Sequence, residues 1–323
     1  MDKFWKNKSV LITGYEGFLG SNLTRRLVAS GAVITGLDIK VNRRETLLTK
    51  DDYKKISVIK GSVADYHLVK DTIRQRKIEY VFHLAAEALV GRCLKDPLRG
   101  FSTNTCGTWN ILEACRDYGR VRAIIVASSD KAYGSAKKLP YRENTPLAGD
   151  HPYDVSKSCA DLIAHTYFNT YGLSVAITRC GNIYGPGDFN FSRLIPDAIR
   201  CMLAGRVFNI RSDGKFIRDY IYVDDVVDGY LALARKFAAK RLAGEAFNFS
   251  NERPLSVLAV IKEIYRIHGA PANYKILDQA QCEIKRQYLC SQKARTILKW
   301  SPAHDIQEGL RKTIRAYKKW LDL

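Results

Sequence analysis

The stretch Ser9-Val10-Leu11-Ile12-Thr13-Gly14-Tyr15-Glu16-Gly17-Phe18-Leu19-Gly20 decides the fold of this chain. Its first part, Val10 to Thr13, is typical of a buried β-strand, and a helical pattern runs from the glycines to about Ser30. Glycines let backbone amides approach a phosphate closely, and the start of a helix adds partial positive charge. A strand, a glycine turn and a helix in this order predict the first unit of a dinucleotide-binding fold.

Strand and helix patterns alternate as far as about residue 180. The apolar runs that favour strands are Ala32–Leu37, Ile56–Ile59, Tyr80–Leu84, Ala123–Ala127 and Val175–Thr178. Helical patterns lie between them near residues 65–75, 104–118 and 152–171. This alternation predicts right-handed βαβ units and an α/β fold with a doubly wound parallel sheet of the Rossmann type. We therefore expect residues 1–180 to form a cofactor-binding domain.

The regular alternation ends after Cys180. Glycines and a proline mark a loop at 181–187, and the sequence beyond it predicts a helix near 193–204, strands near 207–211 and 246–249, and mainly helix afterwards. An amphipathic pattern closes the chain, with Ile306, Leu310, Ile314, Tyr317 and Leu321 on one face. We expect residues 181–323 to form a smaller, interleaved α/β lobe for the substrate, with residues around 215–245 also contributing to the first domain.

The composition is that of a globular protein, with 46% hydrophobic and 26% charged residues among 323. No run approaches the roughly 20 apolar residues that cross a bilayer, and the N-terminus lacks a signal-peptide core, so a cytoplasmic location is expected. Eight dispersed cysteines predict reduced thiols and no metal site. The net charge of +19 suits anionic small molecules, and without a nucleic-acid motif or a basic tract we expect neither a nucleic-acid nor a membrane partner.

Asp38 stands at the end of the second predicted strand, 18 residues after Gly20. An acidic residue at this point accepts hydrogen bonds from the adenosine ribose hydroxyls, and its charge repels a 2′-phosphate. The cofactor is therefore predicted to be NAD rather than NADP. Arg43 and Arg44 argue in the other direction, since either side chain could reach a phosphate.

A second motif follows the strand predicted at Ala123–Ala127. It consists of Ser128-Ser129-Asp130-Lys131 and, further along, Tyr153 and Lys157 four residues apart. On a helix this spacing places Tyr153 and Lys157 on one face. A nearby ammonium lowers the pKa of a tyrosine, and a phenolate can take the proton from a substrate hydroxyl while hydride leaves the carbon. The pattern predicts an NAD-dependent enzyme that oxidises a hydroxyl group.

Together these motifs resemble the extended short-chain dehydrogenases that act on nucleotide sugars, nearly from end to end. The landmarks are Val81–Ala86, Asn104–Thr108, Leu112–Ala114 and Arg179–Gly187. Within that family the chain is most similar to 4,6-dehydratases, above all those acting on CDP-glucose. This likeness is carried by Phe4-Trp5-Lys6, Ser129-Asp130-Lys131, Gly187-Asp188 and Arg193-Leu194-Ile195-Pro196-Asp197.

The resemblance implies a particular reaction. Such dehydratases oxidise the sugar at C4, eliminate water across C5 and C6, and return hydride to C6, so that NAD is regenerated. Tyr153, assisted by Lys157, would be the base at the C4 hydroxyl, and Ser129 would hold the C4 oxygen. Asp130, in its protonated form, would be the acid for the departing C6 hydroxyl. Lys131 stands where other members carry the base for the C5 proton, and it would serve if neutral or by stabilising the enolate.

The resemblance also implies the binding residues and the assembly. NAD would be held by Gly14, Gly17, Phe18, Leu19, Gly20, Asp38, Ser62, Val63, Leu84, Ala85 and Ala86, together with Tyr153 and Lys157. The nucleotide sugar would contact Glu87, Asn182, Arg193, Leu194, Arg218 and Asn251. A homodimer through the helices at 104–118 and 152–171 and a role in polysaccharide biosynthesis are expected.

Departures from the family pattern leave the substrate open. Ser62 stands where an aspartate is usual and Glu87 where a glutamine is common, and Arg218–Asp225 resembles the dTDP, UDP and GDP branches more than the CDP branch. Neither the nucleotide base nor the sugar follows from the sequence. A 4-epimerase, a decarboxylase or a 4-dehydrogenase on the same scaffold would need no acid at Asp130. A non-catalytic sensor of NAD or of a sugar nucleotide is a third hypothesis, and the intact Ser129 argues against it.

Overall fold

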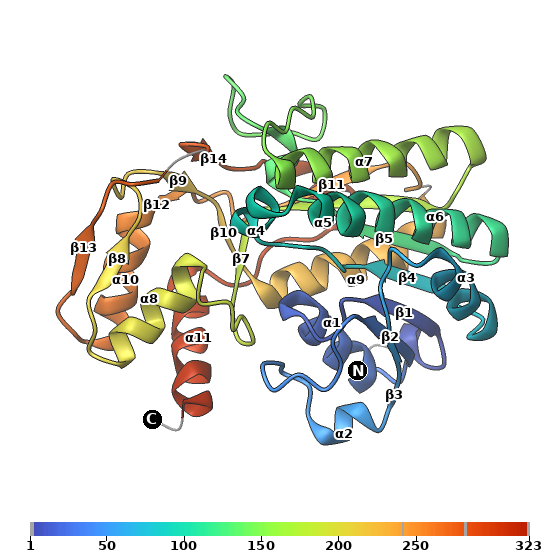
Figure 1. Ribbon diagram of the computed structural model, residues 1–323, viewed down its shortest axis with the longest axis horizontal. Coiled ribbons are helices and arrows are strands. Elements are labelled where there is room, and N and C mark those ends of the chain that lie inside the picture. Colours follow the sequence, from blue (N-terminus) through green and yellow to red (C-terminus); the bar gives the residue numbers. More distant parts are fainter. Residues whose placement is uncertain (1–2, 241, 281–282, 322–323) are drawn as a thin grey trace. The chain divides into compact units, whose positions relative to one another are not determined.

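The computed structural model describes residues 3–240, 242–280 and 283–321 (Figure 1). Its contacts divide the chain into two compact units. Unit 1 comprises Met1–Gly134, Glu143–Arg179 and Val227–Phe247, and unit 2 comprises Ser135–Arg142, Cys180–Val226 and Asn248–Leu323. Each unit is therefore assembled from segments that lie far apart in the sequence.

Unit 1 is built on a seven-stranded sheet in the order β11-β6-β5-β4-β1-β2-β3. Its strands are β1 (Ser9–Thr13), β2 (Val33–Asp38), β3 (Ile56–Lys60), β4 (Tyr80–His83), β5 (Ala123–Ala127), β6 (Val175–Cys180) and β11 (Ala246–Phe249). The pairings from β3 through β2, β1, β4 and β5 to β6 are all parallel. The predicted doubly wound, Rossmann-type sheet is confirmed.

Helices cover both faces of this sheet (Figure 1). They are α1 (Phe18–Ala29), α2 (Lys50–Tyr53), α3 (Tyr66–Gln75), α4 (Val90–Lys95), α5 (Pro97–Phe101), α6 (Gly107–Tyr118), α7 (Pro152–Tyr171) and most of α9 (Val223–Lys240). α6 packs against both α3 and α7, while α1 is joined to α9 by an ion pair of 2.7 Å between Arg26 and Asp228. Coverage on both faces explains why the strands are nearly continuous apolar runs.

The strand order reverses at β1. From β1 the chain passes outward to β2 and β3, and then returns to place β4 on the other side of β1. In open α/β sheets, ligands bind outside the carboxyl ends of the strands at such a switch point. Gly14 follows β1 and Leu84 follows β4, so two of the predicted cofactor segments lie at this point.

Unit 2 is smaller, and its described residues combine short strands with three α-helices and a π-helical turn, Ala294–Leu298. Its strands form the sheets β10-β7, β12-β9-β14 and β13-β8. The strands are β7 (Asn182–Tyr184), β8 (Phe208–Ile210), β9 (Ile217–Arg218), β10 (Tyr220–Tyr222), β12 (Leu255–Ser256), β13 (Tyr274–Ile276) and β14 (Arg286–Gln287), and the helices are α8 (Leu194–Leu203), α10 (Val257–His268) and α11 (Ile306–Trp320). Leu310, Ile314 and Tyr317 of α11 are buried in the core that these helices share.

The structure contains elements that the sequence pattern did not predict. The strands β7, β9, β10, β12 and β14 have only two or three residues, too few for an alternating pattern to be recognised. The helix predicted at 104–118 is an α-helix only from Gly107, because Ser102–Cys106 form a π-helical turn. Such turns are frequent at functional sites.

Candidate functional site

The glycine loop joins β1 directly to α1. Gly14 has a φ of +70°, which favours glycine, and its amide donates to the Leu37 carbonyl at 2.8 Å. A Cβ on Gly20 would lie 2.0 Å from the Gly14 carbonyl oxygen, so only glycine lets the first turn of α1 approach the loop this closely. The start of α1 therefore carries its unpaired amides and its partial positive charge to the switch point of the sheet, which suits a pyrophosphate.

The residues after β4 are held against this loop by Thr13. Its Oγ1 accepts the backbone amides of Leu84 and Ala85, both at 3.1 Å. A Cβ on Gly14 would lie 3.0 Å from the Ala85 backbone, which shows how closely the two segments pass. The predicted cofactor residues that follow β1 and β4 are thus brought together, as the sheet topology requires.

Ser62 and Val63 follow β3 on the same side of the sheet. Ser62 Oγ accepts the amide of Ala64 at 3.1 Å, so the serine supports the turn that leads into α3. Val63 is 3% exposed, and a Cβ on Gly107 would lie 2.5 Å from its Cγ2. Asn110 donates to the Val63 carbonyl at 3.0 Å and fixes this segment onto α6.

His83, at the end of β4, organises a buried hydrogen-bond chain that the sequence analysis missed. Its Nδ1 lies 2.8 Å from Thr13 Oγ1 and its Nε2 lies 3.2 Å from Thr108 Oγ1. The Thr108 hydroxyl donates to the Asn104 carbonyl at 2.6 Å, so its oxygen accepts from His83 Nε2. The imidazole is therefore neutral, and burial, with the nearby charge of Lys157, lowers the pKa of His83 to about 3.

Asn104, in the π-helical turn, extends this chain to the segment that carries Tyr153. Its amide nitrogen donates to Ser156 Oγ at 2.9 Å, and Ser156 donates to the Tyr153 carbonyl at 2.7 Å. Asn104 also pairs with the backbone of Glu87, accepting its amide at 2.8 Å. The Glu87 carboxylate lies 3.3 Å from Arg99 Nε, so this predicted substrate residue forms an ion pair with α5.

Ser129 and Asp130 follow β5. Ser129 Oγ donates to Asp130 Oδ1 at 3.1 Å and accepts the Lys131 amide at 3.2 Å, which caps the 3-10 turn Asp130–Tyr133. Asp130 is only 3% exposed. The predicted acid Asp130 and the predicted C4-oxygen ligand Ser129 are therefore in direct contact at the end of β5.

Tyr153 and Lys157 lie in the first two turns of α7, which packs on the turn that carries Asp130. The Lys157 ammonium donates to the Ala127 carbonyl of β5 at 2.8 Å, two residues before Ser129. Burial lowers the pKa of Lys157 to about 8. The structure thus brings both parts of the predicted catalytic set together within unit 1.

Asp154, directly after Tyr153, is a carboxylate that the sequence analysis overlooked. It is 4% exposed, and burial raises its pKa while the charge of Lys131 partly opposes that rise. Nothing in the helical pattern distinguishes it, because a polar residue in the first turn of a helix normally faces solvent.

In unit 2 the two predicted arginines are both engaged by neighbouring residues. Arg193 precedes α8, and its Nη1 lies 3.2 Å from the buried Asp188 carboxylate, while Leu194 begins the helix. Arg218 is 7% exposed and donates to the Ile217 carbonyl at 3.0 Å and to Glu283 at 3.2 Å. These partners hold the guanidinium groups in fixed positions.

Arg286 is a basic residue on the strand that pairs with the strand of Arg218. It is exposed, and it lies on β14 opposite Ile217 of β9, next to Gln287, which is opposite Arg218. The two-residue strand carries no pattern from which this neighbour could have been predicted. Successive residues of a strand point to opposite faces of a sheet, so the exposed Arg286 and the buried Arg218 lie on different faces.

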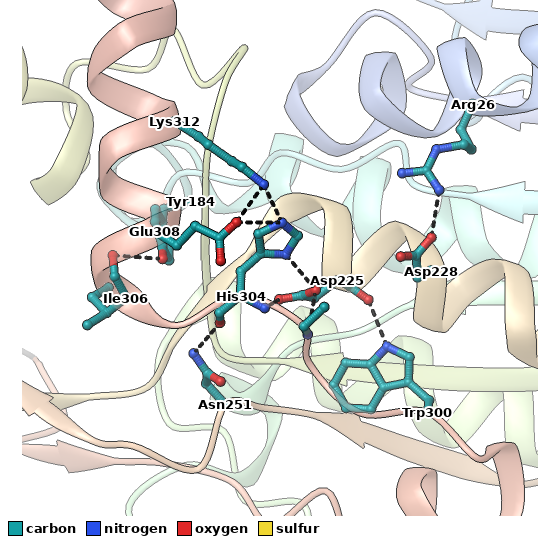
Figure 2. Close-up of polar contacts among 11 residues, drawn as sticks. Arg26, Tyr184, Asp225, Asp228, Asn251, Trp300, His304, Ile306, Glu308 and Lys312 are labelled. Carbon is teal, nitrogen blue, oxygen red and sulfur yellow. Dashed lines mark hydrogen bonds and ion pairs between the residues drawn. The ribbon is translucent and has the colours of Figure 1, made fainter.

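The two predicted asparagines take part in backbone networks. Asn182 begins β7, and its amide donates to the Asp219 carbonyl at 2.8 Å. Figure 2 shows the Asn251 side chain donating to the His304 carbonyl, at 3.2 Å. His304 Nδ1 lies 2.9 Å from the buried Asp225 carboxylate, and its Nε2 accepts from Lys312 at 2.8 Å. Asn251 therefore belongs to a network centred on Asp225.

A protein-family model described as the NAD dependent epimerase/dehydratase family matches residues 10–249. The chain belongs to this family. It is 31% identical to CDP-glucose 4,6-dehydratase of Salmonella typhimurium, over 98% of this chain and 92% of that protein. It is 30% identical to UDP-glucose 4-epimerase of Mycolicibacterium smegmatis, over 95% of this chain and 98% of that protein.

Solved structures show the same fold. The crystal structure of dTDP-glucose 4,6-dehydratase from Bacillus anthracis in complex with NAD superimposes with a TM-score of 0.87, at 27% identity, covering 97% of both chains. The chain is therefore an enzyme of the nucleotide-sugar epimerase/dehydratase group. Dehydratases and epimerases match at nearly equal identity, so these comparisons do not distinguish the two reactions.

The prediction of NAD as the cofactor is confirmed by the family, and the residues present fit it. The glycine loop leaves room that a Cβ would fill, and Asp38 lies at the end of β2 with 6% exposure. Burial raises the pKa of the Asp38 carboxyl, and Arg43 partly offsets this effect. Asp38 Oδ1 accepts from the Lys40 amide at 3.2 Å and from Arg43 at 2.6 Å, which leaves Oδ2 to accept from a ribose hydroxyl.

Within the described part of the chain, no helix is long and apolar enough to cross a bilayer. The same residues contain no group of three metal-binding side chains. Seven cysteines are free thiols, and the eighth, Cys282, lies outside the described residues.

Proposed function

We propose that this chain is an NAD-dependent nucleotide-sugar 4,6-dehydratase. The observation that carries the proposal is Asp130, buried at 3% exposure beside the Ser129 hydroxyl. An elimination needs an acid for the departing hydroxyl, whereas epimerisation and simple oxidation need none. NAD, when bound, supplies the hydride acceptor for C4 and the donor for C6.

In this proposal Tyr153 removes the proton from the C4 hydroxyl, and Ser129 holds the C4 oxygen. Lys157 assists in two ways. Its position is fixed by the Ala127 carbonyl at 2.8 Å, and its pKa of about 8 keeps it mostly protonated at neutral pH. A fixed cation near a phenol stabilises the phenolate and so lowers the pKa of the tyrosine.

Asp130 donates a proton to the C6 oxygen after C4 has become a carbonyl. The C5 proton is then acidic because it is next to that carbonyl, and Lys131 lies in the adjacent position of the turn. In its neutral form Lys131 would accept the C5 proton, and in its charged form it would stabilise the enolate.

The nucleotide diphosphate is assigned to unit 2. The proposal rests on Asn182, Arg193, Leu194, Arg218 and Asn251, which the resemblance to the family assigns to the nucleotide sugar. Arginine in fixed geometry is well suited to phosphate oxygens. A positive net charge of +19 raises the local concentration of anionic substrates. A place in polysaccharide biosynthesis is part of the same proposal.

A 4-epimerase is the second candidate, because an epimerase is among the relatives at 30% identity. The direct test is to incubate the protein with CDP-, GDP-, UDP- and dTDP-hexoses and to record the masses of the products. A loss of 18 mass units is expected for a dehydratase, in accordance with the loss of one water molecule. An unchanged mass with a new sugar epimer would establish epimerisation instead.

The Asp130→Asn variant separates the steps of the proposed reaction. It should still bind the sugar nucleotide and oxidise C4, so that NADH absorbance appears, and it should then stall. Loss of a general acid lowers turnover by about 10²–10⁴-fold. Tyr153→Phe is the matched control, since it should block the earlier step and show no NADH signal. Near-normal turnover of Asp130→Asn would reject the dehydratase proposal and favour the epimerase.

A further inference from the structure

Glu16, in the middle of the glycine loop, is a buried carboxylate with an unusual set of partners. It is 1% exposed, and it accepts the backbone amides of Asn42 at 2.7 Å and Arg43 at 2.8 Å. The Tyr15 hydroxyl donates to it at 2.7 Å. A buried charge is stable only when it is paired or hydrogen-bonded, so Glu16 fixes the segment after β2 onto the glycine loop.

That segment presents Arg43 to Asp38. Arg43 Nη2 lies 2.6 Å from Asp38 Oδ1, and Arg43 Nε lies 3.9 Å from Glu16 Oε2. One guanidinium therefore lies between two buried carboxylates. Asn42 has a φ of +59°, which reverses the chain so that Arg43 points back toward β2. Arg44, the next residue, is exposed and takes part in none of these contacts.

We propose that Glu16 is a positioning residue for cofactor selection. It holds the loop at residues 39–44 so that Arg43 forms its ion pair with Asp38 and is not available to a 2′-phosphate. The negative charge of Asp38 then keeps the protein specific for NAD. The ribose of a bound dinucleotide meets Asp38, so a 2′-phosphate would have to occupy the space beside the same carboxylate. In the wild type that phosphate meets two buried carboxylates, Asp38 and Glu16, and the single Arg43 guanidinium between them offsets only one of their charges. The general role of Asp38 is to bind the ribose. Here Arg43 in addition forms a potential site for a phosphate, and Glu16 holds Arg43 in the position that this site requires.

A single substitution, Asp38→Asn, should therefore change a site that repels a 2′-phosphate into one that attracts it. Asp38→Asn keeps an oxygen that can accept the Lys40 amide, so the loop retains its support. It removes the negative charge and leaves the Arg43 guanidinium directed at the ribose. Charge-assisted hydrogen bonds of this kind correspond to a preference of about 10- to 100-fold.

The test measures which dinucleotide the holoprotein holds. Each variant is incubated with equal excesses of NADP and isotope-labelled NAD, freed of unbound nucleotide and denatured, and the released dinucleotides are quantified by mass spectrometry. The labelled NAD identifies the sites that have exchanged, and the NADP to NAD ratio is taken over those sites only. The ratio for Asp38→Asn should exceed the wild-type ratio by at least about tenfold.

Three double variants identify the cause of any gain. Asp38→Asn with Arg43→Gln should lose most of the gain, whereas Asp38→Asn with Arg44→Gln, which removes the same charge from the neighbouring exposed residue, should keep it. Asp38→Asn with Glu16→Gln should lose most of the gain, because the loop is no longer held. Equal ratios with and without Arg43, or with and without Glu16, would overturn the proposal.

Proteolysis tests the contact between Glu16 and the loop at residues 39–44 without any cofactor. Trypsin should cut after Arg43 or Arg44 at least several-fold faster in Glu16→Gln than in the wild type, while a cooperative melting transition shows that the variant is folded. If the variant does not melt cooperatively, Glu16→Asp is used, since its shorter side chain cannot reach both amides. Unchanged cleavage in a folded Glu16 variant would show that Glu16 does not hold the loop.

Discussion

At the scale of single residues, burial determines which side chains around the proposed catalytic centre carry charge. Burial lowers the pKa of Lys157 to about 8 and, together with Lys157, lowers that of His83 to about 3. It raises the pKa of Asp154. With a pKa of about 3 the imidazole is neutral near pH 7, so it acts as a fixed link between Thr13 and Thr108 and not as a proton carrier.

This neutrality makes His83 a source of acid sensitivity. The unfolded chain binds a proton at His83 near its ordinary pKa of about 6.5, whereas the folded protein resists it until about pH 3. Between these values the unfolded state holds more protons, so stability falls as the pH falls. His83→Gln should reduce the slope of unfolding free energy against pH in this window by one proton, about 1.4 kcal/mol per pH unit.

Urea unfolding of the wild type and His83→Gln at intervals from pH 4 to pH 7 measures this difference in slope. The carboxylates are the same in both proteins, so their contribution to the pH dependence cancels. Parallel curves for wild type and His83→Gln would mean that His83 takes up its proton in the folded state as readily as in the unfolded chain.

Arg218 provides a residue-scale test of the nucleotide site in unit 2. If its guanidinium binds the diphosphate, Arg218→Ala should raise the KM about 10- to 100-fold before it lowers kcat, because a charge-assisted contact is lost equally from ground and transition states. Arg206→Ala is the control, since that side chain is exposed in the loop after α8. An unchanged KM in Arg218→Ala would remove Arg218 from the site.

At the scale of elements, the close approach of the glycine loop to α1 decides whether the cofactor site forms. A Cβ on Gly20 would lie 2.0 Å from the Gly14 carbonyl oxygen, and backbone on both sides leaves no flexible atom to yield. The same element pair also carries Glu16, so displacement of α1 would disturb the loop that presents Arg43. The strand, the turn and the helix thus act as one unit.

Gly20→Ala should therefore abolish retention of NAD on purification while the protein remains folded. Gly91→Ala is the matched control, because Gly91 lies in α4 with no neighbouring atom within 4 Å of an added Cβ. It should retain NAD and melt at the wild-type temperature or slightly above, since alanine favours a helix. The NAD released on denaturation gives the answer, and a normal cofactor content in Gly20→Ala would contradict the strain argument.

At the scale of the whole molecule, α6 and α7 display apolar side chains that the chain's own core leaves exposed. Trp109 is 43% exposed and Leu162 is 55% exposed. The proposed homodimer would bury them in a bundle of four helices, two from each copy. Residues of the same helices that face the sheet, such as Leu112 and Ala164, are fully buried already.

Introducing a charge into this surface should weaken the dimer. Leu162→Glu should raise its dissociation constant by at least about tenfold, because an unpaired charge would be buried at the interface. Val33→Glu is the control, since Val33 is exposed to a similar degree, 54%, at the start of β2. Light scattering over a dilution series gives the mass, and a wild-type monomer at micromolar concentration would exclude the dimer.

Local patterns in the sequence were sufficient for six of the seven strands in the sheet of unit 1, whereas the seventh, β11, was expected in the lobe at 181–323. Apolar runs of four to six residues, the glycine turn and the helical periods between strands predicted the order of these strands, and the parallel sheet follows from connections that each contain at least one helix. They were insufficient for unit 2, whose strands of two or three residues exist only because their neighbours pair with them. Short strands have too little intrinsic preference to be recognised alone.

The sequence by itself determined that a dinucleotide loop, an acidic residue after the second strand and a Tyr-x-x-x-Lys helix occur together. Only the tertiary structure decided what each side chain meets. His83 lies between Thr13 and Thr108, Arg43 is held on Asp38 by Glu16, and Arg218 lies between its own strand and Glu283. These contacts join residues that lie far apart in the chain or on opposite sides of a turn. Their energies depend on burial and distance, which a linear pattern does not encode.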